Sequence, residues 1–174
     1  MPSVTGRALG ERILGIDPGL QITGYGVLEA GATGPIVCEA GFIRSTEGRE
    51  RRDLADRLRA LHSSLVEVID QLRPKIVVVE QLYAHYAHPR TAILMGHARG
   101  VIFLAAAQHD LPVLSYSATR IKKTITGSGR APKDQVQRTM QRELGLAQLP
   151  EPSDVADALA VALCHYYLQK LPAG

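Results

Sequence analysis

The chain has 174 residues, of which 45% are hydrophobic and 21% are charged, with a net charge of +3. These proportions exclude fibrous and disordered classes, and the length predicts one folded domain. The longest uninterrupted apolar run, residues 101–107, is far shorter than the roughly 20 residues of a membrane-spanning helix. We therefore expect a cytoplasmic protein with a loose leader over residues 1–11 and a single domain over residues 12–170.

Three strands are predicted at the start of the chain. The apolar runs cover residues 12–17, 24–30 and 36–44, and a turn containing glycine and proline separates the last two. Strands joined by such short connections predict an antiparallel meander.

A helix follows over residues 49–72, because leucine, valine and isoleucine recur at three- and four-residue spacing and form one apolar stripe. Charges of alternating sign near its start, including Asp53 and Arg57, predict a solvated face. The helix ends before Pro74. The β-branched run within residues 75–80 predicts a strand buried on both faces, as parallel strands are.

The rest of the chain is mostly helical. The expected elements are a helix over residues 90–109, a strand over 111–116, and helices over 118–125, 132–144 and 153–169. Helices that cross between parallel strands predict a mixed α/β sheet covered on both faces.

Two acidic residues stand at the ends of buried strands. Asp17 closes the first apolar run and Glu80 closes the β-branched run. Acids are depleted in strands and are rarely buried without a partner. The carboxyl ends of parallel strands are where open α/β sheets place their ligand sites. If the two strands are parallel neighbours, Asp17 and Glu80 lie side by side at one edge of the sheet.

Two further acids begin the last helix. Asp154 lies in the first turn, where the helix dipole alone would favour an acid, so a purely structural role stays open for it. Asp157 interrupts an apolar run that continues on both sides, so its face of the helix should be buried. The three-residue spacing puts both carboxylates on one face.

A cluster of carboxylates costs free energy through repulsion and desolvation, and a divalent cation offsets that cost. Ligands that are all oxygens suit Mg²⁺ or Mn²⁺ rather than Zn²⁺. A pair of such ions is the usual machinery for phosphodiester hydrolysis. Together the four acids predict a two-metal site.

Basic residues gather between positions 115 and 138, where a single acid, Asp134, accompanies them. They are Arg120, Lys122, Lys123, Arg130, Lys133 and Arg138. Such a block is either a footprint for phosphates or an ordinary solvated face, and charge alone does not decide between the two.

Several stretches resemble the RuvC-type Holliday-junction resolvases in order and spacing. They are GIDPG at 15–19, TGYG at 23–26, VEQ at 79–81, GHARG at 96–100, IKK at 121–123 and DVADALA at 154–160. The resemblance extends from about residue 13 to residue 167, which is nearly the whole chain.

This resemblance implies an RNase H-like fold, with a five-stranded mixed sheet flanked by helices on both faces. It also implies a homodimer that resolves four-way DNA junctions in recombination and repair. Each subunit would nick one strand, leaving a 5′-phosphate and a 3′-hydroxyl. The implied cofactors are two Mg²⁺ ions per site, with Mn²⁺ as a substitute. The implied partner is a branch-migration complex of the RuvA and RuvB type.

The resemblance also assigns roles to individual residues. The implied metal ligands are Asp17, Glu80, Asp154 and Asp157, and the implied catalytic lysines near the scissile phosphate are Lys122 and Lys133. The expected DNA contacts are Tyr83, Tyr86, Arg120, Lys122, Lys123, Arg130 and Lys133. An aromatic side chain in the loop after Glu80 would stack on an unpaired base.

Three alternatives remain to be tested. An actin-like or sugar-kinase ATPase shares an acid at a strand end but needs a second related domain, for which 174 residues leave no room. A non-catalytic junction-binding module would bind DNA without cutting it. A related RNase H-like nuclease would use the same acids on another structured substrate.

Overall fold

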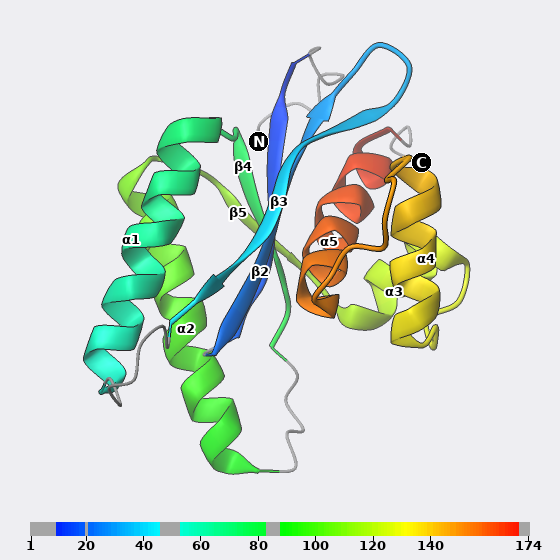
Figure 1. Ribbon diagram of the computed structural model, residues 1–174. Coiled ribbons are helices and arrows are strands. Elements are labelled where there is room, and N and C mark those ends of the chain that lie inside the picture. Colours follow the sequence, from blue (N-terminus) through cyan, green and yellow to red (C-terminus); the bar gives the residue numbers. More distant parts are fainter. Residues whose placement is uncertain (1–9, 20, 46–52, 83–87, 171–174) are drawn as a thin grey trace.

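The computed structural model describes residues 10–19, 21–45, 53–82 and 88–170, in which five strands and five helices follow one another along the chain (Figure 1). The elements are β1 (Arg12–Asp17), β2 (Ile22–Ala30), β3 (Pro35–Arg44), α1 (Leu54–Leu72), β4 (Ile76–Glu80), α2 (Pro89–Gln108), β5 (Val113–Tyr116), α3 (Ala118–Thr126), α4 (Lys133–Glu143) and α5 (Ser153–Lys170). Each element that the sequence predicts is present.

The strands form one sheet in the order β3-β2-β1-β4-β5. β1, β2 and β3 pair antiparallel, which confirms the predicted meander. β4 joins β1 in parallel and β5 joins β4 in parallel, each after a helix. The predicted α/β class with a five-stranded mixed sheet is therefore confirmed.

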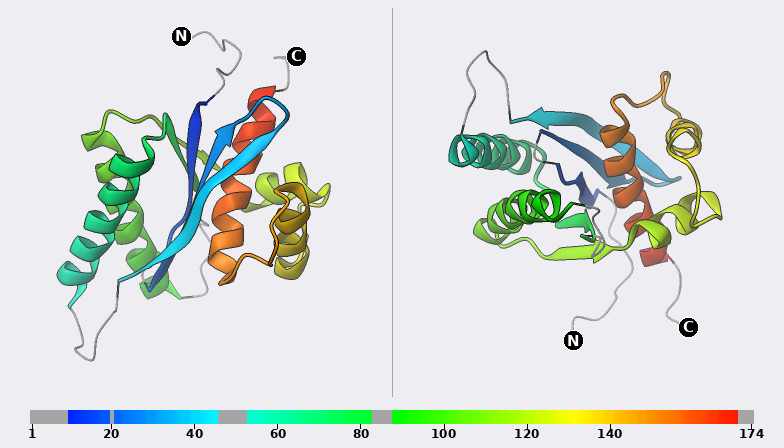
Figure 2. Two further views of the ribbon diagram at one scale, coloured as in Figure 1. Left: turned by 45° about the horizontal axis from the view of Figure 1, so that its top comes forward. Right: turned by 90° about the horizontal axis from the view of Figure 1, so that it is seen from below.

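Helices cover both faces of the sheet (Figures 1 and 2). α1 and α2 lie on one face, whereas α5 lies on the other, with α3 and α4 packed against it. Side chains of a strand alternate between faces, and β1 shows this directly. Ile13 belongs to the core under α5, and Leu14 and Ile16 belong to the core under α1 and α2.

Two glycines allow α5 to approach the sheet closely. A Cβ at Gly15 of β1 would lie 2.3 Å from the carbonyl oxygen of Ala158, and one at Gly24 of β2 would lie 2.0 Å from that of Asp154. Neither contact is possible for a larger residue without movement of the backbone. The first half of α5 is therefore seated on β1 and β2.

The start of α1 differs from the sequence prediction. Asp53 has extended backbone angles, and its side chain accepts a hydrogen bond from the Asp56 N–H, so the helix begins at Leu54 rather than Arg49. Such a cap satisfies an amide left free at the helix N-terminus. Residues 46–52 lie outside the described residues.

The residues just before β1 take part in the sheet. Gly10 and Glu11 exchange backbone hydrogen bonds with Ala30, so the pairing of β1 with β2 continues into the segment predicted as a leader. Residues 1–9 lie outside the described residues. The division into a leader and a single domain stays a prediction.

α2 combines length with apolar composition. With a mean hydropathy of 1.2, it is the one helix in the described part of the chain that is long and apolar enough to cross a membrane, by length and composition only, and 22% of an 18-residue stretch of it is buried. α2 intersperses glycine and polar residues among its apolar ones, so it has no uninterrupted apolar run longer than residues 101–107, and the expectation drawn from such runs stays a prediction. Apolar residues on its outer side include Ile93, Phe103 and Leu104, which are 62%, 38% and 52% exposed.

Candidate active site

Asp17 and Glu80 point to the same side of the sheet. β1 and β4 are parallel neighbours, and the last paired residues before the two acids are Ile16 and Val79. Both of these face α1 and α2. Because side chains alternate along a strand, the carboxylates of Asp17 and Glu80 face α5. The predicted juxtaposition at the carboxyl end of two parallel strands is confirmed.

α5 brings the other two acids to this edge. The Asp154 backbone lies against Gly24, next to the end of β1. Asp157 lies one turn further along and is flanked by the buried Ala156 and Ala158, as its place within an apolar run predicts.

The four carboxylates interact electrostatically. Burial raises the pKa of Asp17 to about 8, and the charges of Asp157, Glu80 and Asp154 contribute to this rise in that order of importance. Burial also raises the pKa of Glu80, with a contribution from Asp157. The pKa of Asp157 is raised by burial and, to a smaller extent, by Asp154. The site thus concentrates negative charge where water solvates it poorly.

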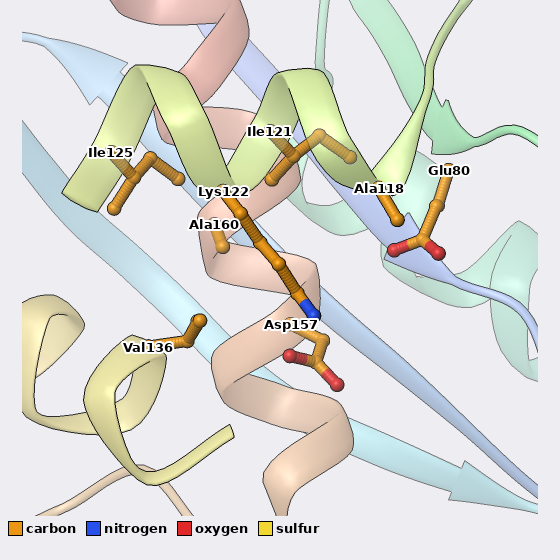
Figure 3. A pocket seen from close by; sticks show the side chains of 8 residues that line it. All are labelled: Glu80, Ala118, Ile121, Lys122, Ile125, Val136, Asp157 and Ala160. Carbon is orange, nitrogen blue, oxygen red and sulfur yellow. The ribbon is translucent and has the colours of Figure 1, made fainter. Parts of the chain in front are cut away.

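Two lysines partly compensate this charge. The Lys133 ammonium, at the start of α4, lies 4.0 Å from a carboxylate oxygen of Asp157. Lys122 of α3 points toward Asp157, and Glu80 at the end of β4 lines the same cavity (Figure 3). Lys122, Glu80 and Asp157 line a cavity of about 20 Å³ with apolar walls that include Ile121 and Val136, which is room for about one water molecule. Both lysines lower the pKa of Glu80 and Asp157.

The donor set fits a divalent cation in its chemistry. All four candidate ligands are carboxylates, the donors that Mg²⁺ and Mn²⁺ prefer. Within residues 10–19, 21–45, 53–82 and 88–170, no three His, Cys, Asp or Glu side chains are gathered closely enough to hold an ion. The charges of neighbouring acids nevertheless contribute to the raised pKa values of Asp17, Glu80 and Asp157, so the carboxylates interact at this edge.

A larger cavity opens beside Asp154. Its volume is about 450 Å³, and it lies among the β1–β2 turn and the first turns of α1, α2 and α5. Its lining residues are Gly19, Gln21, Ile22, Arg57, Thr91, Leu94, Met95 and Asp154. Arg57 was predicted to belong to a solvated helix face, and it is half-buried and lines this cavity. Its position one turn into α1 places it against the turn that follows β1.

The other predicted DNA contacts differ in their surroundings. Arg120, Lys123 and Arg130 lie on α3 and the loop after it, and all three are exposed. The Arg120 guanidinium carbon lies 5.4 Å from the centre of the Tyr116 ring. Tyr83 and Tyr86 lie outside the described residues, so the predicted base-stacking loop stays a prediction.

Sequence reasoning did not find Gln21, Arg57 or Thr91 as residues of the site. Polar residues in a turn or the first turn of a helix are common, so no local signal separates these from ordinary surface residues. Their meeting beside Asp154 follows from the three-dimensional arrangement of three separate elements.

The fold and the acids together define a class of protein. A mixed sheet of this order, with carboxylates at the ends of two parallel strands and on the helix that crosses them, is the architecture of RNase H-like nucleases.

Comparison with known proteins identifies the family. The family model for "Crossover junction endodeoxyribonuclease RuvC" matches residues 13–165. The RuvC of Rhodopirellula baltica is 52% identical over 162 residues, covering 92% of this chain and 88% of the relative. The RuvC of Moorella thermoacetica is 47% identical, covering 88% of this chain and 89% of the relative. The chain belongs to the RuvC family of crossover junction endodeoxyribonucleases.

A solved structure supports the same assignment. The structure described as T. thermophilus RuvC in complex with Holliday junction substrate matches with a TM-score of 0.83 and 31% identity, covering 91% of this chain and 95% of that chain. The resemblance found in the sequence, the RNase H-like fold and the enzyme class are thus confirmed. The ATPase alternative does not hold.

Proposed function

We propose that this protein is a structure-specific endonuclease that resolves Holliday junctions during DNA recombination and repair. The observation that carries the proposal is the convergence of four carboxylates, from β1, β4 and α5, on one edge of the sheet. Membership of the RuvC family supports the choice of a four-way junction as the substrate.

Asp17, Glu80, Asp154 and Asp157 would hold two Mg²⁺ ions, for which Mn²⁺ would substitute. When bound, such ions activate a water molecule for attack on the phosphodiester and stabilise the oxygen that leaves. The four side chains come from the rigid parts of the fold, two from strand ends and two from a helix seated on glycines. Because no three of the described carboxylates are gathered closely enough to hold an ion, their side chains would draw together as the ions bind.

Lys122 and Lys133 would stabilise negative charge that develops on the phosphate. Both are cations directed at the carboxylate cluster from α3 and α4. A fixed cation aimed at developing charge acts most strongly where water is excluded, and the apolar walls around Lys122 provide such an environment. Water would add to phosphorus and the P–O3′ bond would break, so the products would be a 5′-phosphate and a 3′-hydroxyl.

We also propose a homodimer that associates through the outer side of α2. Ile93 and Leu104 are exposed there, and a Cβ at Gly96 or Gly100 of the same helix would meet nothing within 4 Å. Glycine weakens a helix by up to about 1 kcal/mol, and these two have no close packing partner in the described part of the subunit. Small residues between apolar ones allow a second helix to approach closely, and paired sites would produce the symmetric nicks.

The dimer proposal can be tested by sedimentation velocity. Wild type should sediment as a dimer, and Leu104→Glu should sediment as a folded monomer, whereas Leu149→Glu, which changes an exposed leucine elsewhere, should remain dimeric. A Leu104→Glu variant that stays dimeric would exclude this face.

The DNA would approach from the side of α3, where Arg120, Lys123 and Arg130 lie at the surface. Such side chains fix the position of the phosphate backbone rather than read sequence. Tyr83 and Tyr86 would stack on bases near the crossover. A branch-migration complex of the RuvA and RuvB type would deliver the junction, and the protein would act in the cytoplasm.

The test of the function compares two substrates of the same sequence. A labelled synthetic four-way junction and a linear duplex are incubated with Mg²⁺, Mn²⁺ or chelator. We expect paired symmetric nicks in the junction alone, which chelator abolishes. Binding without cutting under either metal would favour a non-catalytic module, and equal cutting of the duplex would indicate a nuclease with another substrate.

A further inference from the structure

Arg99 of α2 reaches across to the end of β4. One of its guanidinium nitrogens donates a hydrogen bond to the backbone carbonyl of Glu80, and another donates to the Ser115 hydroxyl of β5 at 2.7 Å. The side chain is half-buried. Arg99 therefore ties α2 to the two parallel strands at the place where the carboxylate cluster begins.

These contacts hold the peptide unit that follows Glu80. Its carbonyl accepts from Arg99, and its N–H, which belongs to Gln81, donates to the Tyr116 carbonyl at 2.8 Å. A peptide unit is planar, so fixing both of its polar groups fixes its orientation. This orientation sets one of the two backbone torsions at Glu80, and thereby the direction in which its side chain leaves the strand.

Arginine suits this position better than another donor. Its planar guanidinium presents several N–H groups in a rigid fork, so one side chain serves acceptors on two strands. The ring of Phe103, one turn along α2, lies under the guanidinium with its centre 4.7 Å from the central carbon. A cation over an aromatic face is attracted to it, and this contact limits where the guanidinium moves.

Arg99 and the Glu80 carboxylate act on opposite faces of the sheet. The guanidinium comes from the face covered by α1 and α2, and the carboxylate points to the face covered by α5. Arg99 is thus placed to orient the backbone without occupying the site.

We propose that Arg99 is a positioning residue that sets the Glu80 carboxylate in the geometry required to bind a divalent cation. This inference rests on the proposed role of Glu80 as a metal ligand. Groups that hold a metal ligand in place typically contribute a factor of about 10 to 100 in metal affinity.

Positioning and simple electrostatics predict opposite results when Arg99 is removed. A positive charge near the site repels a cation, so its loss alone would tighten cation binding. Loss of the hydrogen bonds to Glu80 and Ser115 would weaken it. The sign of the change therefore separates the two roles.

The test measures Mn²⁺ binding to the full-length protein without DNA, from the loss of the free-ion signal in electron paramagnetic resonance. Arg99→Met should bind Mn²⁺ about 10- to 100-fold more weakly than wild type. Arg99→Lys keeps the charge and a single ammonium donor, so its Mn²⁺ affinity should lie between those of wild type and Arg99→Met. The matched control is Arg90→Met, which removes an exposed cation from the first turn of the same helix and should bind at least as tightly as wild type.

Thermal melts without metal show whether each variant is folded. A folded Arg99→Met with wild-type or tighter Mn²⁺ affinity would overturn the proposal. If that variant does not fold, Arg99→Lys decides, and wild-type affinity in the folded lysine variant would overturn it. Equal binding by wild type and Glu80→Gln would instead remove Glu80 from the ligand set, and Arg99 would have no ligand to position.

Discussion

The face of the sheet under α1 and α2 and the face under α5 use different side chains. On the first face, Leu14, Ile16 and Val79 pack against large residues of α1 such as Leu61 and Leu65. On the second face, glycines of β1 and β2 meet the alanine-rich start of α5. The first face has the composition of an ordinary apolar core, and the second allows two backbones to approach closely.

The difference shows that the close approach of α5 is confined to the glycines beside the acids. Large apolar side chains contribute roughly 1.5–3 kcal/mol each when fully buried, and both faces have them, for example Leu14 on the first face and Leu28 on the second. The close contact on the second face places Asp154 and Asp157 next to Asp17 and Glu80, and the cost of this arrangement is visible in the raised pKa of Asp17.

The largest effect is expected from Glu80→Gln. Loss of one ligand charge should reduce junction cleavage by about 10³-fold or more, because a bound metal supplies several kcal/mol of charge stabilisation. Binding of the junction in the presence of chelator should persist. The matched control is Glu67→Gln, which changes an acid of α1 on the other side of the sheet and should cleave like wild type. Comparable activity of the two variants would contradict the assignment.

A smaller effect is expected from neighbouring lysines of α3. Lys122→Met should lower the single-turnover cleavage rate by about 10²-fold, as the loss of one fixed donor to developing charge does elsewhere. Lys123→Met should weaken DNA binding slightly and leave the rate of the chemical step unchanged, since Lys122, unlike its neighbour, lines the cavity with Glu80 and Asp157. Equal rates in the two variants would remove Lys122 from the catalytic set.

The close approach of α5 can be tested with two glycines of neighbouring segments. Gly24→Ala would force a Cβ against Asp154, whereas Gly34→Ala would meet nothing within 4 Å. Overpacking of this kind costs about 1–3 kcal/mol, and each kcal/mol lowers the melting temperature of a chain of this size by about 2–4 °C. Gly34→Ala should melt like wild type. A Gly24→Ala variant with unchanged melting and cleavage would show that the contact is unimportant.

The last prediction concerns the stability of the protein without metal. Burial raises the pKa of Asp17 in the folded protein to about 8, whereas its ordinary pKa is 3.8. At a pH between these two pKa values, the folded state therefore retains a proton that the unfolded state releases. This contribution therefore makes the folded state less stable as pH rises from about 4 to 8. The amide introduced by Asp17→Asn cannot ionise, so this variant should have a higher melting temperature in chelator, with a gain that grows between pH 5 and pH 8. A gain that is the same at both pH values would contradict the raised pKa.

The elements on both faces could be predicted because their patterns are local. The strand ends at Asp17 and Glu80 follow from apolar runs that an acid closes, and the buried side of α5 follows from the run that Asp157 interrupts. The start of α1 could not be placed, since charged residues continue through Asp53, and the capping hydrogen bond of Asp53 rather than composition sets where the helix begins.

Contacts between distant segments were not predictable in the same way. Arg99 stands in a stretch of small residues, and nothing in its neighbourhood along the chain indicates that it binds the carbonyl of Glu80. Arg57 stands among alternating charges, and only the folded chain brings it to the cavity beside Asp154. Both depend on how the elements pack around the sheet.

The most direct test of the carboxylate cluster is anomalous diffraction from crystals of the wild-type protein grown with Mn²⁺. We expect two Mn²⁺ peaks about 3.5–4 Å apart, coordinated by carboxylate oxygens of Asp17, Glu80, Asp154 and Asp157. Mn²⁺ bound elsewhere, with these four carboxylates uncoordinated in a protein that cuts DNA, would contradict this assignment.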